Sequence, residues 1–239
     1  MRAEEAIVLA GGFGTRLRGV VADVPKPLAR VAGRPFLAWV LDFLASQGLR
    51  RAVLATGYMA DKVQAAVGGR WQTMDIAYSV ESEPLGTGGA LKLAASRLHG
   101  AAAHVVNGDT FLRYSLSGLE DAAHAAQVPI AVALAQVPDA ARYGAVAVRD
   151  GRITAFHEKG GRGPGLVNAG SYYLSAGALQ ALPVQAAFSF ETEVLLPQAA
   201  GGRLAAFVQT REFIDIGVPE DFARAQALFA ASVPADEEA

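Results

Sequence analysis

A short apolar run that leads straight into a glycine-rich segment limits the fold of this chain more than any other feature. Residues 6–10 read Ala-Ile-Val-Leu-Ala, and Gly11, Gly12 and Gly14 follow at once. A run of this length and composition is typical of a buried strand. Glycine permits tight turns and lets backbone N–H groups approach phosphate oxygens closely. The start of the chain therefore predicts a buried strand that ends in a phosphate-binding turn.

The same alternation of apolar runs and helical periodicity continues through the first half of the chain. It predicts strands at 52–56, 76–80 and 103–106, and helices at 36–47, 61–67 and 89–98. The second half favours strands at 128–136, 144–149, 153–157, 167–174 and 204–208, a strand-like segment at 213–216, and helices at 191–196 and 220–229. Alternating strands and helices indicate a doubly wound, mostly parallel mixed α/β sheet of Rossmann-like form. We expect one domain over residues 1–232 and a tail over 233–239.

Composition excludes several classes of function. The chain has 239 residues, a net charge of −2 and no cysteine, which argues against a nucleic-acid partner, disulfides and thiolate metal sites. The apolar run at 6–10 is too short for a signal or membrane segment. We expect a cytoplasmic globular protein with no membrane partner, present as a monomer or a homodimer.

Two familiar phosphate-binding loops do not match the glycine-rich segment. A dinucleotide fingerprint read from Gly12 would need a third glycine where the chain has Leu17, and a Walker loop would need Gly-Lys-Ser/Thr. Arg16 offers a planar fork for phosphate, and Lys26 offers a mobile point charge. Taken alone, the segment is also compatible with a structural turn that carries a solvated Arg16.

The segment does not stand alone. Gly11-Gly12-Phe13-Gly14-Thr15-Arg16-Leu17 with Pro25-Lys26-Pro27-Leu28 resembles the signature of the sugar nucleotidyltransferase family. The resemblance continues through Glu83-Pro84-Leu85-Gly86-Thr87-Gly88-Gly89-Ala90, Asn107-Gly108-Asp109, Glu158-Lys159, Asn168-Ala169-Gly170 and Phe213-Ile214-Asp215-Ile216-Gly217. It implies a nucleotide-binding half over 1–127 and a sugar-binding half over 128–232. The implied enzyme transfers a nucleoside monophosphate from a nucleoside triphosphate to a sugar 1-phosphate and releases pyrophosphate.

The resemblance also implies the roles of individual residues. Arg16 and Lys26 would neutralise phosphate charge as the catalytic pair. Asp109 and Asp215 would bind Mg²⁺, for which carboxylates are suitable ligands, although an Asp beside Gly also commonly caps a turn. The nucleotide would contact Leu9, Ala10, Gly11, Gly12, Gly14, Thr15, Glu81, Pro84, Leu85, Gly86, Thr87 and Gly88.

Glu81 matches the family position that reads the edge of the base. A carboxylate there would accept two parallel hydrogen bonds from guanine N1–H and N2–H₂, which favours GTP. Relatives that transfer UMP can also carry Glu at this position, and an exposed Glu at a strand end is the alternative interpretation.

The sugar site is implied at Asn107, Tyr143, Gly144, Glu158, Lys159 and Asn168. Segments 106–110 and 213–222 look most like the branch that transfers GMP to D-glycero-α-D-manno-heptose 1-phosphate. A mannose-1-phosphate guanylyltransferase and a MurNAc-1-phosphate uridylyltransferase are the alternatives within the family. A non-catalytic nucleotide-sugar-binding regulatory subunit is the alternative from another class.

Overall fold

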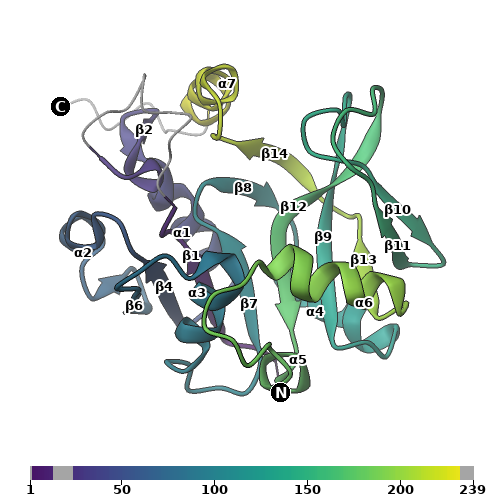
Figure 1. Cartoon of the computed structure of the whole chain (residues 1–239). Helices are drawn as coiled ribbons and strands as arrows, with labels where there is room; N and C mark the ends of the chain where they lie inside the picture. Colours follow the sequence, from purple (N-terminus) through teal and green to yellow (C-terminus); the bar gives the residue numbers. More distant parts are fainter. Residues whose placement is uncertain (1, 13–23, 232–239) are drawn as a thin grey trace.

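A large mixed sheet forms the centre of the molecule in the computed structural model, which describes residues 2–12 and 24–231 (Figure 1). Ten strands are arranged in the order β10-β11-β13-β9-β12-β7-β1-β4-β6-β5, beside two-stranded pairs β14-β8 and β2-β3. The elements are β1 (Glu5–Leu9), η2 (Lys26–Leu28), β2 (Arg30–Val31), β3 (Arg34–Pro35), α1 (Phe36–Ser46), β4 (Arg51–Thr56), α2 (Ala60–Val67), β5 (Arg70–Trp71), β6 (Met74–Val80), α3 (Gly86–Ala95), β7 (Ala103–Asn107), β8 (Thr110–Arg113), α4 (Leu116–Ala125), β9 (Ile130–Val137), β10 (Val146–Arg149), β11 (Arg152–Phe156), β12 (Gly165–Leu174), α5 (Ala176–Gln180), η3 (Glu191–Leu195), α6 (Leu196–Ala200), β13 (Leu204–Phe207), β14 (Arg211–Asp215) and α7 (Pro219–Ala230).

The first half of the chain contributes the parallel part of this sheet. β1 pairs in parallel with β4 on one side and β7 on the other, and β4 pairs in parallel with β6. The carboxyl ends of these strands therefore meet at one edge, where open α/β sheets bind ligands. The predicted strands are confirmed within a few residues, and so is the mostly parallel mixed α/β fold.

The second half joins the same sheet through an antiparallel strand. β12 pairs antiparallel with β7, with Ser171 opposite Val106, and its other edge pairs antiparallel with β9. β9 then pairs in parallel with β13. The two halves thus share one hydrogen-bonded sheet, and the division at residues 127 and 128 stays a prediction about function.

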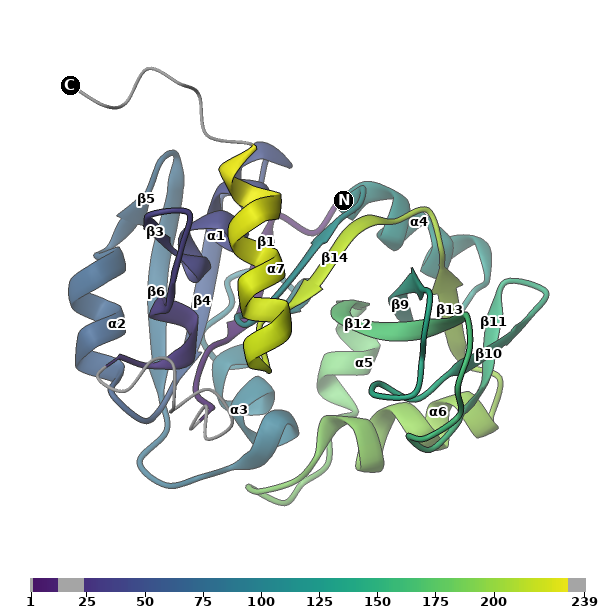
Figure 2. The same ribbon diagram turned by 90° about the horizontal axis from the view of Figure 1, so that it is seen from above.

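Helices cover both faces of the sheet, because side chains alternate between the faces along each strand. In β1, Ala6 and Val8 join one core cluster and Ile7 joins the other. Helices α1, α2, α4 and α7 supply buried residues to the first cluster, and α3, α5 and α6 supply the second. Figure 2 shows α7 above the β1 and β4 region, with β14 leading to it from the side of β9 and β13.

Several helices differ from the sequence prediction. Helix α3 begins at Gly86, so the predicted nucleotide contacts Gly86, Thr87 and Gly88 already belong to the helix. Helices α4 and α5 were not predicted, although each has a serine N-cap, the local signal that marks a helix start. Ser115 accepts a hydrogen bond from the Gly118 N–H at 3.0 Å, and Ser175 accepts one from the Ala178 N–H at 3.3 Å.

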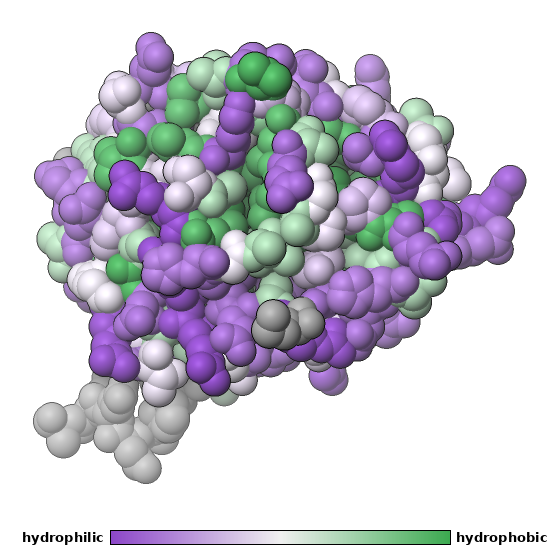
Figure 3. Space-filling view, turned by 90° about the horizontal axis from the view of Figure 1, so that it is seen from below, coloured by the Kyte–Doolittle hydropathy of each residue, from purple (hydrophilic) through white to green (hydrophobic). Residues whose placement is uncertain are grey.

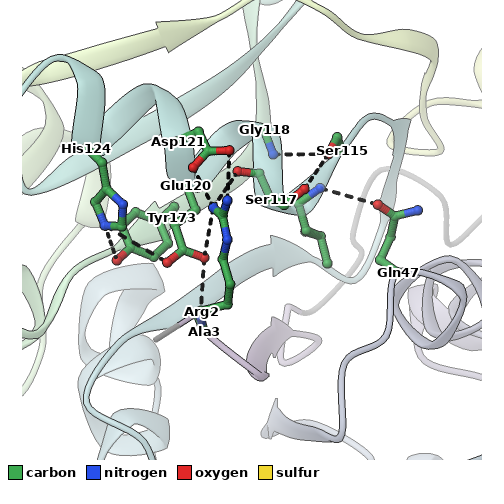
Figure 4. Close-up of polar contacts among 11 residues, drawn as sticks. Arg2, Ala3, Gln47, Ser115, Ser117, Gly118, Glu120, Asp121, His124 and Tyr173 are labelled. Atoms are coloured by element: carbon green, nitrogen blue, oxygen red, sulfur yellow. Dashed lines mark hydrogen bonds and ion pairs between the residues drawn. The ribbon is translucent and has the colours of Figure 1, made fainter.

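Helix α4 is tied to the residues that precede β1 (Figure 4). Arg2 donates to Asp121 at 2.9 Å and to the Ser117 carbonyl at 3.1 Å, and the Ala3 N–H donates to Glu120 at 3.2 Å. The Glu120 residue is only 1% exposed, and a carboxylate this buried needs such partners. These bonds connect the first residues of the chain to the region that leads into the second half.

Buried His104, on β7, makes folding sensitive to acid. The residue is 1% exposed and its ring lies 5.7 Å from that of Tyr173, and burial lowers the pKa of His104 to about 4. The unfolded chain, with a histidine pKa near 6.5, binds one more proton between these pH values. We therefore expect the free energy of unfolding to fall by up to about 3 kcal/mol as pH drops from about 6.5 to 4.

Denaturant unfolding of the wild type and of His104→Gln across this range tests the expectation. The wild type should lose about 1 kcal/mol per pH unit more than the variant, which has no imidazole to titrate. Equal slopes for the two proteins would contradict the assignment of a neutral buried His104.

The side of the molecule opposite to the view of Figure 2 is drawn in Figure 3, where hydrophilic and hydrophobic residues are interspersed. Among residues 2–12 and 24–231, no helix has the length and apolar character needed to cross a membrane.

Candidate functional site

Two adjoining cavities lie at the carboxyl edge of the parallel strands. The first has a volume of about 320 Å³ and is lined by Leu9, Ala10, Gly12, Lys26, Pro27, Asn107, Asp109, Thr110, Asp215 and Gly217. The second has a volume of about 280 Å³ and is lined by Leu9, Gly11, Gly12, Ala55, Glu81, Pro84, Gly86, Thr87, Ala90, Asn107 and Asp109. Leu9, Gly12, Asn107 and Asp109 line both cavities, so the two form one continuous cleft. We call the first the charged chamber and the second, which contains the residue Glu81 predicted to read a base, the base chamber.

The charged chamber brings Lys26 between two carboxylates. The Lys26 ammonium donates to Asp109 Oδ2 at 2.6 Å and lies 3.6 Å from Asp215 Oδ1. The Lys26 side chain is only 13% exposed, whereas those of Asp109 and Asp215 are 35% and 29% exposed. The Lys26 ammonium thus lies where the two carboxylates converge. Two converging carboxylates are the charge pattern of a site for a positive ion.

Three separate backbone features hold the carboxylates there. Gly108 donates its N–H to the Leu9 carbonyl at 2.8 Å, which fixes the turn between β7 and β8 at the end of β1. β8 pairs antiparallel with β14, with Thr110 opposite Asp215. Asp215 Oδ1 also accepts the Gly217 N–H at 2.8 Å. Residues more than one hundred positions apart therefore meet by strand pairing.

The electrostatics of the charged chamber favour a cation. Burial raises the pKa of Asp215 above its ordinary value, the nearby Lys26 ammonium opposes this rise, and the Asp109 carboxylate adds to it. A group of three or more His, Asp or Glu side chains suited to a metal ion does not occur in the described part of the chain. Asp109 and Asp215 would therefore need oxygen ligands from outside the protein, such as phosphate and water, to complete a shell.

The base chamber is built around Glu81 at the end of β6. Its carboxylate accepts the Leu85 N–H at 3.2 Å, and its own N–H donates to the Thr56 carbonyl at 2.9 Å. The Glu81 side chain lies over Gly57, where a Cβ would come within 2.6 Å of Oε1. Sequence reasoning missed Gly57, although a glycine directly after the predicted strand at 52–56 was a usable signal.

Two predicted nucleotide contacts, Leu85 and Gly88, have a packing role in the structure. Neither is among the residues that line the base chamber. A Cβ on Gly88 would lie 2.1 Å from the ring of Phe188, and the Leu85 carbonyl accepts the Phe188 N–H at 2.9 Å. Glycine is needed here because a distant segment packs directly on the start of α3. Pro84, Gly86 and Thr87 do line the chamber.

The predicted sugar residues fall into two groups. Asn107 lines both chambers, and Asn168 lies nearby on β12, which pairs with β7. The Asn168 amide donates to the Tyr172 hydroxyl at 3.0 Å. Tyr143, Gly144, Glu158 and Lys159 form the second group, in the loops that follow β9 and β11, and line neither chamber.

The second group is held together by backbone bonds between two loops. The His157 N–H donates to the Ala145 carbonyl at 2.8 Å, and the Gly160 N–H donates to the Ala141 carbonyl at 2.7 Å. Glu158 and Lys159 are exposed side chains on the second loop. Gly14 and Thr15, predicted to contact the nucleotide, and Arg16, predicted to neutralise phosphate charge, lie outside the described residues.

Comparison with known proteins gives consistent results. Residues 5–232 match the family described as Nucleotidyl transferase. The chain is 36% identical to a D-glycero-α-D-manno-heptose 1-phosphate guanylyltransferase of Aneurinibacillus thermoaerophilus, over 93% of this chain and 96% of the relative. It is 34% identical to a mannose-1-phosphate guanylyltransferase of Mycobacterium tuberculosis, over 93% of this chain and 64% of the relative. Its fold matches the crystal structure of HddC from Yersinia pseudotuberculosis complexed with GMP-PN, with a TM-score of 0.83, 34% identity and coverage of 95% and 99% of the two chains.

Proposed function

The chain belongs to the nucleotidyl transferase family, and we propose that it transfers GMP from GTP to D-glycero-α-D-manno-heptose 1-phosphate. One observation carries the proposal: the base chamber, with the Glu81 carboxylate, opens into the charged chamber, with Lys26 and two aspartates. A nucleoside triphosphate has the same order of parts, with a base at one end and a polyanion at the other. The similarity to the heptose-specific relative and to a GMP-PN complex supports the guanine and heptose assignments.

The reaction joins two anions, so charge neutralisation and alignment are the protein's main tasks. An oxygen of the sugar phosphate forms a bond to the α-phosphorus of GTP, and the bond from that phosphorus to the bridging oxygen of pyrophosphate breaks. Pyrophosphate leaves with the electron pair of that bond. Lys26 is suited to neutralise charge at the α-phosphate, because its ammonium is a compact point charge that faces the charged chamber. We assign the triphosphate and the leaving pyrophosphate to Arg16.

Nucleotidyl transferases of this family generally use a divalent metal ion, and we propose Mg²⁺ for this chain. Asp109 and Asp215 would hold it, since both are hard oxygen donors and a cationic ammonium already lies between them. When bound, the ion would act as a Lewis acid and neutralise phosphate charge. Heptose binding is assigned to Asn107, Asn168 and the loop segments that carry Tyr143, Gly144, Glu158 and Lys159. Cytoplasmic location and a one- or two-copy assembly stay predictions.

Removal of divalent metal is expected to abolish turnover. Without a divalent cation, two carboxylates and two phosphate-bearing substrates would meet with only the protein's own cations to neutralise them. Pyrophosphate release should fall to background in excess EDTA and return when Mg²⁺ is added beyond the chelator. Full activity in excess EDTA would remove the metal role from Asp109 and Asp215.

Glu81→Gln is expected to lower kcat/KM for GTP by about 10- to 100-fold. The amide oxygen can still accept the Leu85 N–H, but it cannot accept two hydrogen bonds from guanine with a full negative charge. The KM for the sugar phosphate should stay within about twofold, because Glu81 lies in the base chamber. A variant as selective for GTP as the wild type would show that Glu81 does not read the base.

Identification of the product tests the proposal as a whole. The protein is incubated with GTP, the heptose phosphate and Mg²⁺, and the nucleotide products are separated and weighed by mass spectrometry. A GDP-heptose formed in equal amount to pyrophosphate is the expected result. Mannose 1-phosphate is the second candidate acceptor, which the mannose-specific relative favours, and a GDP-mannose formed at a higher rate would move the assignment to it.

A further inference from the structure

Asp221 is a buried carboxylate outside both chambers. It lies in the first turn of α7 and is 4% exposed. Arg142 contacts one carboxylate oxygen, the Tyr143 hydroxyl donates to the same oxygen at 3.4 Å, and Arg224 reaches the other oxygen at 3.2 Å. Arg224 belongs to the same helix, whereas Arg142 and Tyr143 come from the loop between β9 and β10. Asp221 thus connects two segments that lie far apart in the sequence.

Helix α7 is anchored firmly on the nucleotide half. Phe229 stacks on Trp39 with ring centroids 4.7 Å apart and meets Phe111 edge-on at 4.9 Å. The Gln226 side chain bonds the Ala32 N–H and the Arg30 carbonyl, each at 2.8 Å. The strand that leads into this helix, β14, ends at Asp215. The Asp221 carboxylate is therefore rigidly connected to the carboxylate that we assign to the metal.

The loop between β9 and β10, which we call the Arg142 loop, is connected by hydrogen bonds to the loop between β11 and β12, which carries Glu158 and Lys159. The Ala140 N–H donates to the Gly163 carbonyl at 2.9 Å, and the Gly160 N–H donates to the Ala141 carbonyl at 2.7 Å. The ring of Tyr143 also meets that of Phe213, on β14, edge-on at 5.3 Å. A shift of the Arg142 loop would therefore move Glu158 and Lys159 relative to Asp215.

We propose that Arg142 and Asp221 are positioning residues. Their ion pair sets the distance between the loop that carries Glu158 and Lys159 and strand β14, which ends at Asp215. This inference rests on the proposed function, because it concerns the alignment of the acceptor with GTP. Neither side chain lines the charged chamber or the base chamber, so the pair acts through the segments it connects. Since alignment of two reactants controls the rate of transfer, loosening the pair should weaken acceptor binding and slow turnover.

Arg142→Ala and Arg224→Ala form a matched test. Both arginines are partly exposed, at 40% and 58%, and both contact Asp221, but only Arg142 crosses between the two segments. We expect Arg142→Ala to raise the KM for the sugar phosphate at least about tenfold and to lower kcat, with the KM for GTP within about twofold. Arg142→Lys should recover part of the loss, and Arg224→Ala should behave as the wild type. Equal effects of the two alanine variants, or equal rises in both KM values, would overturn the proposal.

Amide hydrogen exchange separates this inference from the proposed function, because it requires no turnover. Arg142→Ala should speed exchange in residues 157–163 and 211–217, and Arg224→Ala should not. Unchanged exchange at 157–163 in Arg142→Ala would overturn the positioning role even in an active enzyme. A wild type that fails to form any nucleotide sugar would contradict the proposed function, and the exchange comparison would still decide whether the pair couples the two loops.

Discussion

Replacement of Lys26 by alanine is expected to lower kcat by about 30- to 1,000-fold while the fold survives. The range corresponds to about 2–4 kcal/mol, the loss measured when one preorganised charge-stabilising group is removed. Lys26 carries the ammonium of the charged chamber and lies within 2.6 Å of Asp109. Steady-state kinetics and an unfolding curve on the same preparation test the expectation. Wild-type rates in Lys26→Ala would show that the phosphate assignment is wrong.

The same variant should change metal binding in the opposite direction. In the free enzyme the Lys26 ammonium contacts both carboxylates and competes with any divalent ion for them. Its removal leaves two negative charges without their nearest cation, so affinity for a divalent ion should rise at least about tenfold. Titration of Mn²⁺ into nucleotide-free protein, followed by electron paramagnetic resonance, measures this directly. A slower enzyme that also binds Mn²⁺ more weakly would contradict a competing role for Lys26.

Asp109→Asn is expected to lower kcat by at least about 100-fold. The amide keeps the shape of the side chain but removes the charge that balances a divalent ion, so Mn²⁺ affinity should fall together with turnover. Asp75→Asn is the control, because Asp75 is an exposed carboxylate near the start of β6 and lies at the other end of the strand from the cleft. If Asp109→Asn retained full turnover and Mn²⁺ affinity, Asp109 would be a turn-capping residue and no more.

Local patterns were sufficient for the elements that surround the cleft. The apolar runs that became β1, β4, β6 and β7 are short and end in polar or glycine residues, so both their existence and their carboxyl ends could be predicted. Because the carboxyl ends of parallel strands meet at one edge of a sheet, these patterns are enough to place Asp109 near the end of β6. Helix α4 carries two local signals that the prediction missed, its serine cap and the apolar residues Leu116, Leu119 and Ala123 at helical spacing.

Contacts between distant segments were beyond local reasoning. The pairing of β8 with β14, which brings Asp215 beside Asp109, depends on two short strands about one hundred residues apart. It was anticipated only through the resemblance to a known family. Gly88 shows the same limit, because no local pattern indicates that its neighbour in space is Phe188, against which no side chain at position 88 would fit. Asp221 and Arg142 carry no motif, and only the structure brings them together.

A guanine nucleotide and a heptose phosphate are proposed to react in one cleft, and the rate of pyrophosphate release with Mg²⁺ measures whether they do. GTP, UTP, CTP, ATP and dTTP are each paired with D-glycero-α-D-manno-heptose 1-phosphate, mannose 1-phosphate, glucose 1-phosphate and MurNAc 1-phosphate, and kcat/KM is compared across the set. We expect the highest value for GTP with the heptose phosphate. A higher value for another pair would contradict the specificity, and background release from every pair would contradict the enzymatic function itself.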